Sequence, residues 1–339
     1  MKKRVFMKKL SRDKVIAAHL GVAIGDAMGA PVETMTSSRI KEVLGPDGVT
    51  GYLPAVLHKH EWARGLAPGA TTDDWALTAA MSRAIIKEPN GVTLRTCVEA
   101  HLHAYHNSPF GFGKTTMESM ARWESGATEL AELYSHAEAT VQKKSGNGTI
   151  MKLMPVVLLG IEKGDVLGVP LLHMSSRITH RDARSIVLAH AAYVYAVEDY
   201  RTGGEEAEDL SAYLLDMSID YLDRTIELSM KDKELFASDI AQCLTTITTN
   251  IASLPSRFTA METAPFVISV CQHVRSFKEG ILLAVNAGGD TDTNASIVGG
   301  ILGLRYGTSA IPQEWVSGCL SSHEAVLLAN QLCDALDIA

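Results

Sequence analysis

Two short acidic clusters, more than 200 residues apart, have the clearest capacity for chemistry in this sequence. Asp73 and Asp74 follow two threonines, and Asp290 and Asp292 alternate with threonines behind Gly288-Gly289. Each cluster opens a predicted helix, where one carboxylate can satisfy free backbone amides and complement the helix dipole. Capping explains either cluster alone. It needs only one acid, however, and adjacent carboxylates repel each other, so the two clusters together indicate a bound cation.

The oxygen-rich composition of both clusters narrows the kind of cation. No cysteine or histidine stands beside either cluster in the sequence. Hard oxygen donors favour Mg²⁺, Mn²⁺ or Ca²⁺ over zinc. Four acids and the neighbouring hydroxyls are enough for two ions about 3.5–4 Å apart, the usual two-metal spacing. The glycine pair before Asp290 would permit a tight turn toward a partner loop. We therefore expect the two clusters to share one pocket.

Weaker features have both a functional and an ordinary interpretation. Glu33 follows Pro31 just past a predicted helix end, where an acid is more often solvated than catalytic. The segments Ser145–Met151 and Gly111–Thr116 are glycine-rich, and free amides there could cradle a phosphate, although an ordinary turn is the simpler explanation. His180 could stack on or hydrogen-bond a ligand, whereas a lone histidine is more often structural.

Helical periodicity dominates the chain, because apolar residues recur at three- and four-residue steps. Ser11 or Asp13 offers the first N-cap, and Thr71 with Asp74 forms a capping-box pattern before the second helix. Candidate strands around Val49–Leu57 are few and short. We predict an all-α fold. The predicted helices are Asp13–Met28, Leu77–Ile85, Ser185–Val197, Asp209–Leu222 and Thr291–Leu304.

Length and composition bound the class of protein. The 339 residues allow two domains, but no stretch resembles a linker, so we expect one domain over 1–339 with a basic tail at 1–12. A net charge of −8 makes a broad nucleic-acid surface unlikely.

Five scattered cysteines without a CxxC pair predict neither a disulfide framework nor a thiolate zinc site. The uncharged stretch Ile240–Ser256 is too polar to span a membrane, and the start lacks a secretory signal. We expect a cytoplasmic protein without a membrane partner.

In their order along the chain, these motifs resemble the ADP-ribosylglycohydrolase family, including the dinitrogenase-reductase-activating glycohydrolases. The resemblance extends from about residue 20 to Trp315. The ordered set is far more specific than any one motif. It implies a compact orthogonal helical bundle of the ADP-ribosylglycohydrolase type with a bimetal cleft. The matching segments are Gly25–Glu33, Thr72-Asp73-Asp74, Gly111–Thr115, Gly146-Asn147-Gly148 with Met151, Thr179-His180 and Gly289–Thr293.

The resemblance also implies roles for individual residues. Two Mg²⁺ or Mn²⁺ ions would be the cofactors, and the acids Glu33, Asp73 and Asp292 would be catalytic. Trp75 and Lys152 depart from the family's usual residues; both leave the metal set intact and bear on substrate preference. The implied metal ligands are Thr72, Asp73, Asp74, Asp290, Asp292 and Thr293. The implied substrate-binding residues are Gly113, Lys114, Thr115, Asn147, Gly148, Thr149, Met151 and His180.

The expected reaction is hydrolysis of the glycosidic bond between ADP-ribose and a protein side chain, with arginine as the favoured acceptor. Serine, nucleic-acid and small-molecule adducts stay open as substrates. An oxygen-rich bimetallic site also suits phosphoester hydrolysis. An immunity-type protein that reverses or blocks a toxin ADP-ribosyltransferase is a further alternative, so the expected partners are an ADP-ribosylated protein and such a transferase.

Overall fold

The structure, a computed structural model, describes residues 9–55, 58, 63–108, 111–129, 146–180, 182–205, 209–225, 230–248, 250–255 and 258–339. Residues 1–8 of the predicted tail and Ser145 of the glycine-rich segment lie outside these ranges. Leu10 is buried and Ser11 caps the first helix, so the last residues of the predicted tail belong to the folded body.

The described part of the chain is all-α, as predicted, and contains only two isolated β-bridges, Thr36 with Gly288 and Gly146 with Thr259. Residues 49–55 form no strand. The α-helices are α1 (Arg12–Gly29), α2 (Ser37–Leu44), α3 (Asp73–Lys87), α4 (Leu94–Asn107), α5 (Lys114–Glu124), α7 (Met154–Lys163), α8 (Asp165–Thr179), α9 (Ala183–Thr202), α10 (Leu210–Thr225), α11 (Met230–Leu244), α12 (Ala260–His273), α13 (Phe277–Asn286), α14 (Thr291–Tyr306), α15 (Gln313–Gly318) and α16 (Ser322–Leu336).

The predicted helices correspond to α1, α3, α9, α10 and α14, and one of the predicted caps is wrong. Ser11 caps α1 as expected, with its hydroxyl accepting from the backbone amide of Lys14. Thr71 does not cap α3. That helix begins at Asp73, and the Thr71 hydroxyl is instead 2.8 Å from the hydroxyl of Ser321.

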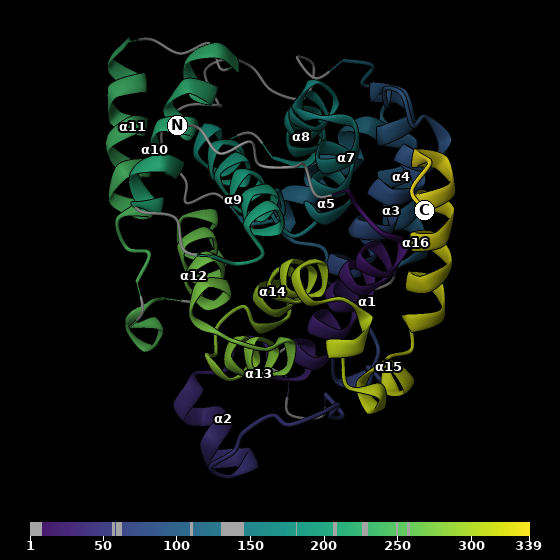
Figure 1. Cartoon of the computed structure of the whole chain (residues 1–339), viewed down its shortest axis with the longest axis vertical. Helices are drawn as coiled ribbons and strands as arrows, with labels where there is room; N and C mark the ends of the chain where they lie inside the picture. The colour runs from purple at the N-terminus through teal and green to yellow at the C-terminus, as the bar shows by residue number, and fades with distance from the viewer. Residues whose placement is uncertain are drawn as a thin grey trace.

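Helices α1 and α14 lie side by side at the centre of the molecule, with α13, α12 and α9 on one side and α3 and α16 on the other (Figure 1). Their backbones are in direct contact. A Cβ placed on Gly25 of α1 would lie 2.1 Å from the carbonyl oxygen of Ala295 in α14, and one on Gly29 would lie 2.4 Å from the Cα of Asp292. Only glycine permits this approach. It places the end of α1 against the start of α14, where an acidic cluster stands.

Residues 12–32 form the one helical stretch in the described residues that is long and apolar enough to cross a membrane. Its most apolar window is 94% buried inside the fold. A helix packed on all sides by other helices carries the same composition, so burial in the core explains its hydropathy.

Replacing Gly25 by alanine tests the contact between α1 and α14. We expect Gly25→Ala to lower the free energy of unfolding by about 1–3 kcal/mol, because the new methyl group overlaps backbone that cannot give way. Urea unfolding in excess EDTA measures the change. Gly65→Ala is the control, because Gly65 is exposed and its Cβ would meet nothing within 4 Å. Equal stabilities for the two variants would contradict the contact.

Candidate metal centre

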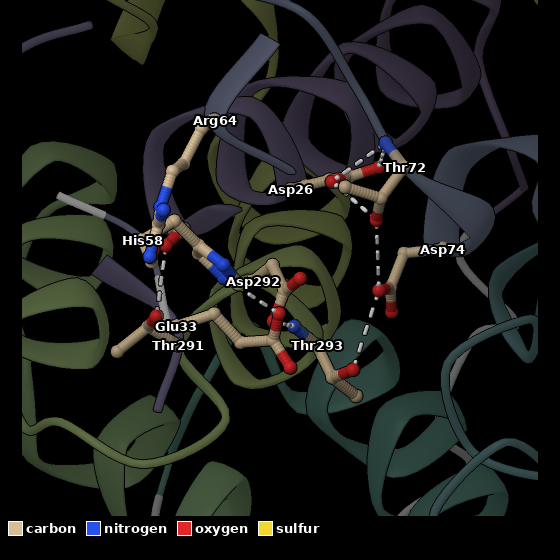
Figure 2. A network of polar contacts seen from close by, with 10 residues as sticks. Asp26, Glu33, His58, Arg64, Thr72, Asp74, Thr291, Asp292 and Thr293 are labelled. Atoms are coloured by element: carbon tan, nitrogen blue, oxygen red, sulfur yellow. Dashed lines mark hydrogen bonds and ion pairs between the residues drawn. The ribbon is translucent and has the colours of Figure 1, made fainter. Parts of the chain in front are cut away.

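Asp26, a buried acid in α1, caps helix α3 from another part of the chain. Its carboxylate accepts hydrogen bonds from the Thr72 amide at 2.9 Å and the Thr72 hydroxyl at 2.9 Å (Figure 2). It also accepts from the Trp75 amide at 3.0 Å. The Trp75 amide is the group that the side chain of the N-cap residue, Thr72, would otherwise satisfy. Asp73 and Asp74 therefore open α3 without having to cap it.

Asp74 joins the two acidic clusters. The hydroxyls of Thr293 and Ser296, both in α14, donate to its carboxylate at 3.2 and 3.1 Å. The side-chain amide of Asn147 donates to Asp290 at 2.7 Å and so brings the glycine-rich segment to the same place. The expectation that folding unites the two clusters is confirmed, although they are distant in the sequence.

The carboxylates form two overlapping groups of three, which we call carboxylate triads. One group contains Asp26, Asp74 and Asp292, and the other contains Glu33, Asp290 and Asp292; within each, one carboxylate oxygen per residue lies within 4.8 Å of the other two. Asp292 belongs to both groups. Such an arrangement fits two neighbouring cations that share a ligand residue, and the all-oxygen donor set fits hard ions such as Mg²⁺ or Mn²⁺.

Burial and mutual repulsion make the negative charge of these carboxylates energetically unfavourable without a cation. Desolvation raises the pKa of Asp26 to about 7 and that of Asp290 to about 6. Desolvation, and then the neighbouring acids, hold the pKa values of Asp73, Asp74 and Asp292 well above their usual range. No lysine or arginine among the described residues forms an ion pair with any of these five aspartates. Divalent cations would supply the missing positive charge.

Glu33 approaches the cluster from the 3-10 turn η1 (Ala30–Val32), which follows α1. Its carboxylate is 3.1 Å from Nε2 of His58, which is fully buried (Figure 2). The Arg64 guanidinium donates to the His58 backbone carbonyl at 2.8 Å and holds that residue in place. Glu33 itself stays partly accessible, with its side chain 16% exposed. It is therefore positioned to meet a ligand.

All of these acids except Asp26 line a cavity of about 340 Å³, together with most of the residues predicted to bind substrate. Thr72 and Thr149 are the two candidates that do not line it. The Thr72 side chain is bound to Asp26, and the Thr149 hydroxyl is 2.8 Å from the hydroxyl of Ser185. The predicted residues that line the cavity are Glu33, Asp73, Asp74, Gly113, Lys114, Thr115, Asn147, Gly148, Met151, His180, Asp290, Asp292 and Thr293.

Two residues of this centre were not among the candidates. Asp26 lies inside the matching segment Gly25–Glu33, and its place at the apolar end of a helix was a signal that could have identified it, because buried aspartates need partners. His58 stands in a segment without periodicity or motif, and nothing in the sequence connects it with Glu33.

The sequence profile of the ADP-ribosylglycohydrolase family matches residues 7–338. The chain belongs to the ADP-ribosylglycohydrolase family. It is 26% identical to ADP-ribosyl-dinitrogen reductase glycohydrolase of Rhodospirillum rubrum, with 90% of each chain covered. It is 24% identical to ADP-ribosylarginine hydrolase Tri1 of Serratia proteamaculans, with 95% of this chain and 79% of that protein covered.

A solved structure described as an ADP-ribosylglycohydrolase-related protein complex has the same fold. It superimposes with a TM-score of 0.70 at 21% identity and covers 96% of this chain and 98% of its own. The side chains of the two residues that depart from the usual ADP-ribosylglycohydrolase pattern contact residues other than the predicted metal ligands. Trp75 donates from its indole to Glu324 of α16, and Lys152 contacts His101 and Thr179.

The raised pKa values predict how cation binding depends on pH. In EDTA, acids whose pKa is raised by folding contribute stability below their unfolded pKa, and this contribution is lost as the pH rises through their folded values. Cations replace those protons, so the increase in Tm on adding Mg²⁺ or Mn²⁺ should grow as the pH rises from about 5 to about 8. Differential scanning fluorimetry measures this increase.

Burial lowers the pKa of His19 to about 4 and that of His101 to about 3, so their contribution to stability grows with pH. Neither residue contacts the carboxylates, so this contribution is the same with and without the cation and cancels in the difference. KCl at matched ionic strength controls for screening. A Tm increase that is the same at both pH values would contradict a carboxylate site.

Proposed function

We propose that this protein hydrolyses the N-glycosidic bond between ADP-ribose and a modified arginine side chain of a protein. The proposal rests on one observation. The two carboxylate triads meet at a cavity whose lining is rich in glycines and hydroxyl groups. Arginine is favoured because one relative, which matches 95% of this chain, is named as an ADP-ribosylarginine hydrolase. Cytoplasmic location and an ADP-ribosyltransferase partner stay predictions.

The two triads suggest where cations would be held. Asp26, Asp74 and Asp292 would hold one. Asp290 and Asp292 would hold the other, and Glu33, the third acid of that triad, would serve as the proton donor. When bound, these ions supply Lewis acidity toward ribose hydroxyls and lower the pKa of water. The hydroxyl of Thr293 donates its proton to Asp74, so its oxygen could still serve as a cation ligand beside that triad.

The remaining acids take the steps at the reacting bond. Asp73 lines the cavity but belongs to neither triad, so it can orient the attacking water. The water oxygen forms a bond to C1″ of the ribose and gives a proton to Asp73, while the bond from C1″ to the arginine nitrogen breaks. Glu33, held by His58 and partly accessible, can deliver a proton to that nitrogen. The developing positive charge at C1″ is stabilised by the nearby carboxylates.

The activity assay follows release of ADP-ribose from an arginine-ADP-ribosylated protein. We expect Asp73→Ala and Asp290→Ala each to lower the rate by at least about a hundredfold, because Asp73 would orient the attacking water and Asp290 would hold a cation at the site. Glu42→Ala is the matched control, since Glu42 is an exposed acid whose ion pair among the described residues is with Arg39. Full activity in either variant, or in excess EDTA, would refute the proposal. Phosphate or AMP as the product would indicate phosphoester hydrolysis instead.

The sharing of Asp292 predicts a difference in metal stoichiometry. Free Mn²⁺ measured by EPR should show two ions bound per wild-type chain. Asp290→Asn should keep one tight ion because the Asp26 triad is intact, whereas Asp292→Asn should weaken both. Equal stoichiometry in the two variants would contradict the shared ligand.

A further inference from the structure

Lys152 is a buried cation next to the cavity that the proposed chemistry does not use. Its side chain is 1% exposed, and it directly follows Met151, which lines the cavity. Its ammonium lies 2.7 Å from the hydroxyl of Thr179 and 3.2 Å from Nε2 of His101. Neither partner is an acid. Burying a charge in this way costs stability, which calls for a functional explanation.

The contacts of His101 fix the direction of the hydrogen bonds from Lys152. Nδ1 of His101 is 2.7 Å from the carbonyl oxygen of Cys97, which can only accept. Nδ1 therefore carries the ring proton, because burial keeps the pKa of His101 at about 3 and the ring neutral. Nε2 of His101 then accepts from Lys152. A charged lysine has no lone pair, so it also donates to Thr179.

The hydrogen bond that Thr179 accepts from Lys152 determines which group donates between Thr179 and His180. Its oxygen accepts from Lys152, so its own proton is free to donate. The nearest acceptor is Nδ1 of His180 at 2.9 Å, closer than the Ser176 carbonyl oxygen at 3.4 Å. Nδ1 of His180 thus receives a hydrogen bond, and the proton of the neutral ring must be on Nε2.

Nε2 of His180 belongs to the cavity, between two glycines. A Cβ built on Gly146 would lie 3.3 Å from this nitrogen, and one built on Gly148 would lie 2.5 Å from the adjacent Cε1. Asn147, between the glycines, donates to Asp290 of the metal centre. The N–H of His180 is therefore available to a ligand that also reaches the carboxylates.

We propose that Lys152, acting through Thr179, fixes His180 as the tautomer protonated on Nε2, so that His180 donates a hydrogen bond to a phosphate oxygen of the bound ADP-ribosyl group. The ligand class rests on the proposed function. A diphosphate only accepts hydrogen bonds, and a neutral histidine in the other tautomer would present a lone pair to it. Lys152 and Thr179 are positioning residues, and the charge of Lys152 adds attraction for an anion.

The first test is the tautomer of His180 in the free protein. Proton–nitrogen correlation spectra of ¹⁵N-histidine-labelled protein at about pH 6 distinguish Nδ1–H from Nε2–H. Near that pH Lys152, whose pKa burial lowers to about 7, is charged, while the pKa of His180 is about 3. We expect Nε2–H in wild type and in Thr179→Ser, which keeps the hydroxyl. Thr179→Val and Lys152→Met should lose this preference, because each interrupts the hydrogen-bond chain.

The second test is binding and kinetics. In Thr179→Val, Kd for free ADP-ribose and KM for the modified protein should rise by roughly tenfold or more, with a much smaller change in kcat, because a remote phosphate contact contributes to uniform binding. Thr179→Ser should restore both values. Thr202→Val is the control, because the Thr202 hydroxyl, within the described part of the chain, bonds the backbone of its own helix.

An unchanged His180 tautomer in Thr179→Val overturns the proposal, and so does a KM within about twofold of wild type. Unchanged Mn²⁺ stoichiometry in the variants shows that they fold with the metal centre intact. A wild-type protein that shows the Nε2–H tautomer but does not bind ADP-ribose would count against the proposed function and leave the hydrogen-bond chain supported.

Discussion

The backbone contact between α1 and α14 is the constraint on which the site depends. Side chains ordinarily hold packed helices about 8–10 Å apart. Here glycines at positions 25 and 29 let the main chains meet, so the end of α1 lies directly against the start of α14. Asp26 and Asp292 then fall within the same small volume although 266 positions separate them in the chain. With a larger residue in place of Gly29, the first turn of α14 would be displaced, and Asp292 would leave both carboxylate triads.

The second requirement is that capping and metal binding use different acids. Helices α3 and α14 both begin at the cavity, so their positive dipole ends partly offset the charge there. Asp26 takes the hydrogen bonds that a cap of α3 would take, which leaves Asp74 for the hydroxyls of Thr293 and Ser296. Dipoles and hydroxyls do not neutralise five buried aspartates, as their raised pKa values show. The fold thus positions the acids at a cost to stability that divalent cations can offset.

Sequence patterns predicted what is local and failed where a partner comes from far along the chain. The periodicity of α1 and α14 and the excess of acids at two helix starts are local, and both were found. The capping box failed because capping rules assume a partner within one turn, whereas Asp26 lies 46 residues from Thr72. For the same reason, the contact of His58 with Glu33 could not be predicted. Thr149 belongs to the correct segment, but its hydroxyl points to Ser185, an orientation that only the packing of α9 determines.

The cavity combines two kinds of recognition that a simple metal site does not need. The carboxylates call for cations, and cations in turn favour hydroxyl or water oxygens. Around the same space, His180 and Lys114 offer donors, which suit a ligand rich in acceptors. A sugar with neighbouring hydroxyls satisfies the first requirement, and a diphosphate satisfies the second. ADP-ribose contains both groups in one molecule, whereas a free sugar or an inorganic phosphate would leave half of the lining unused.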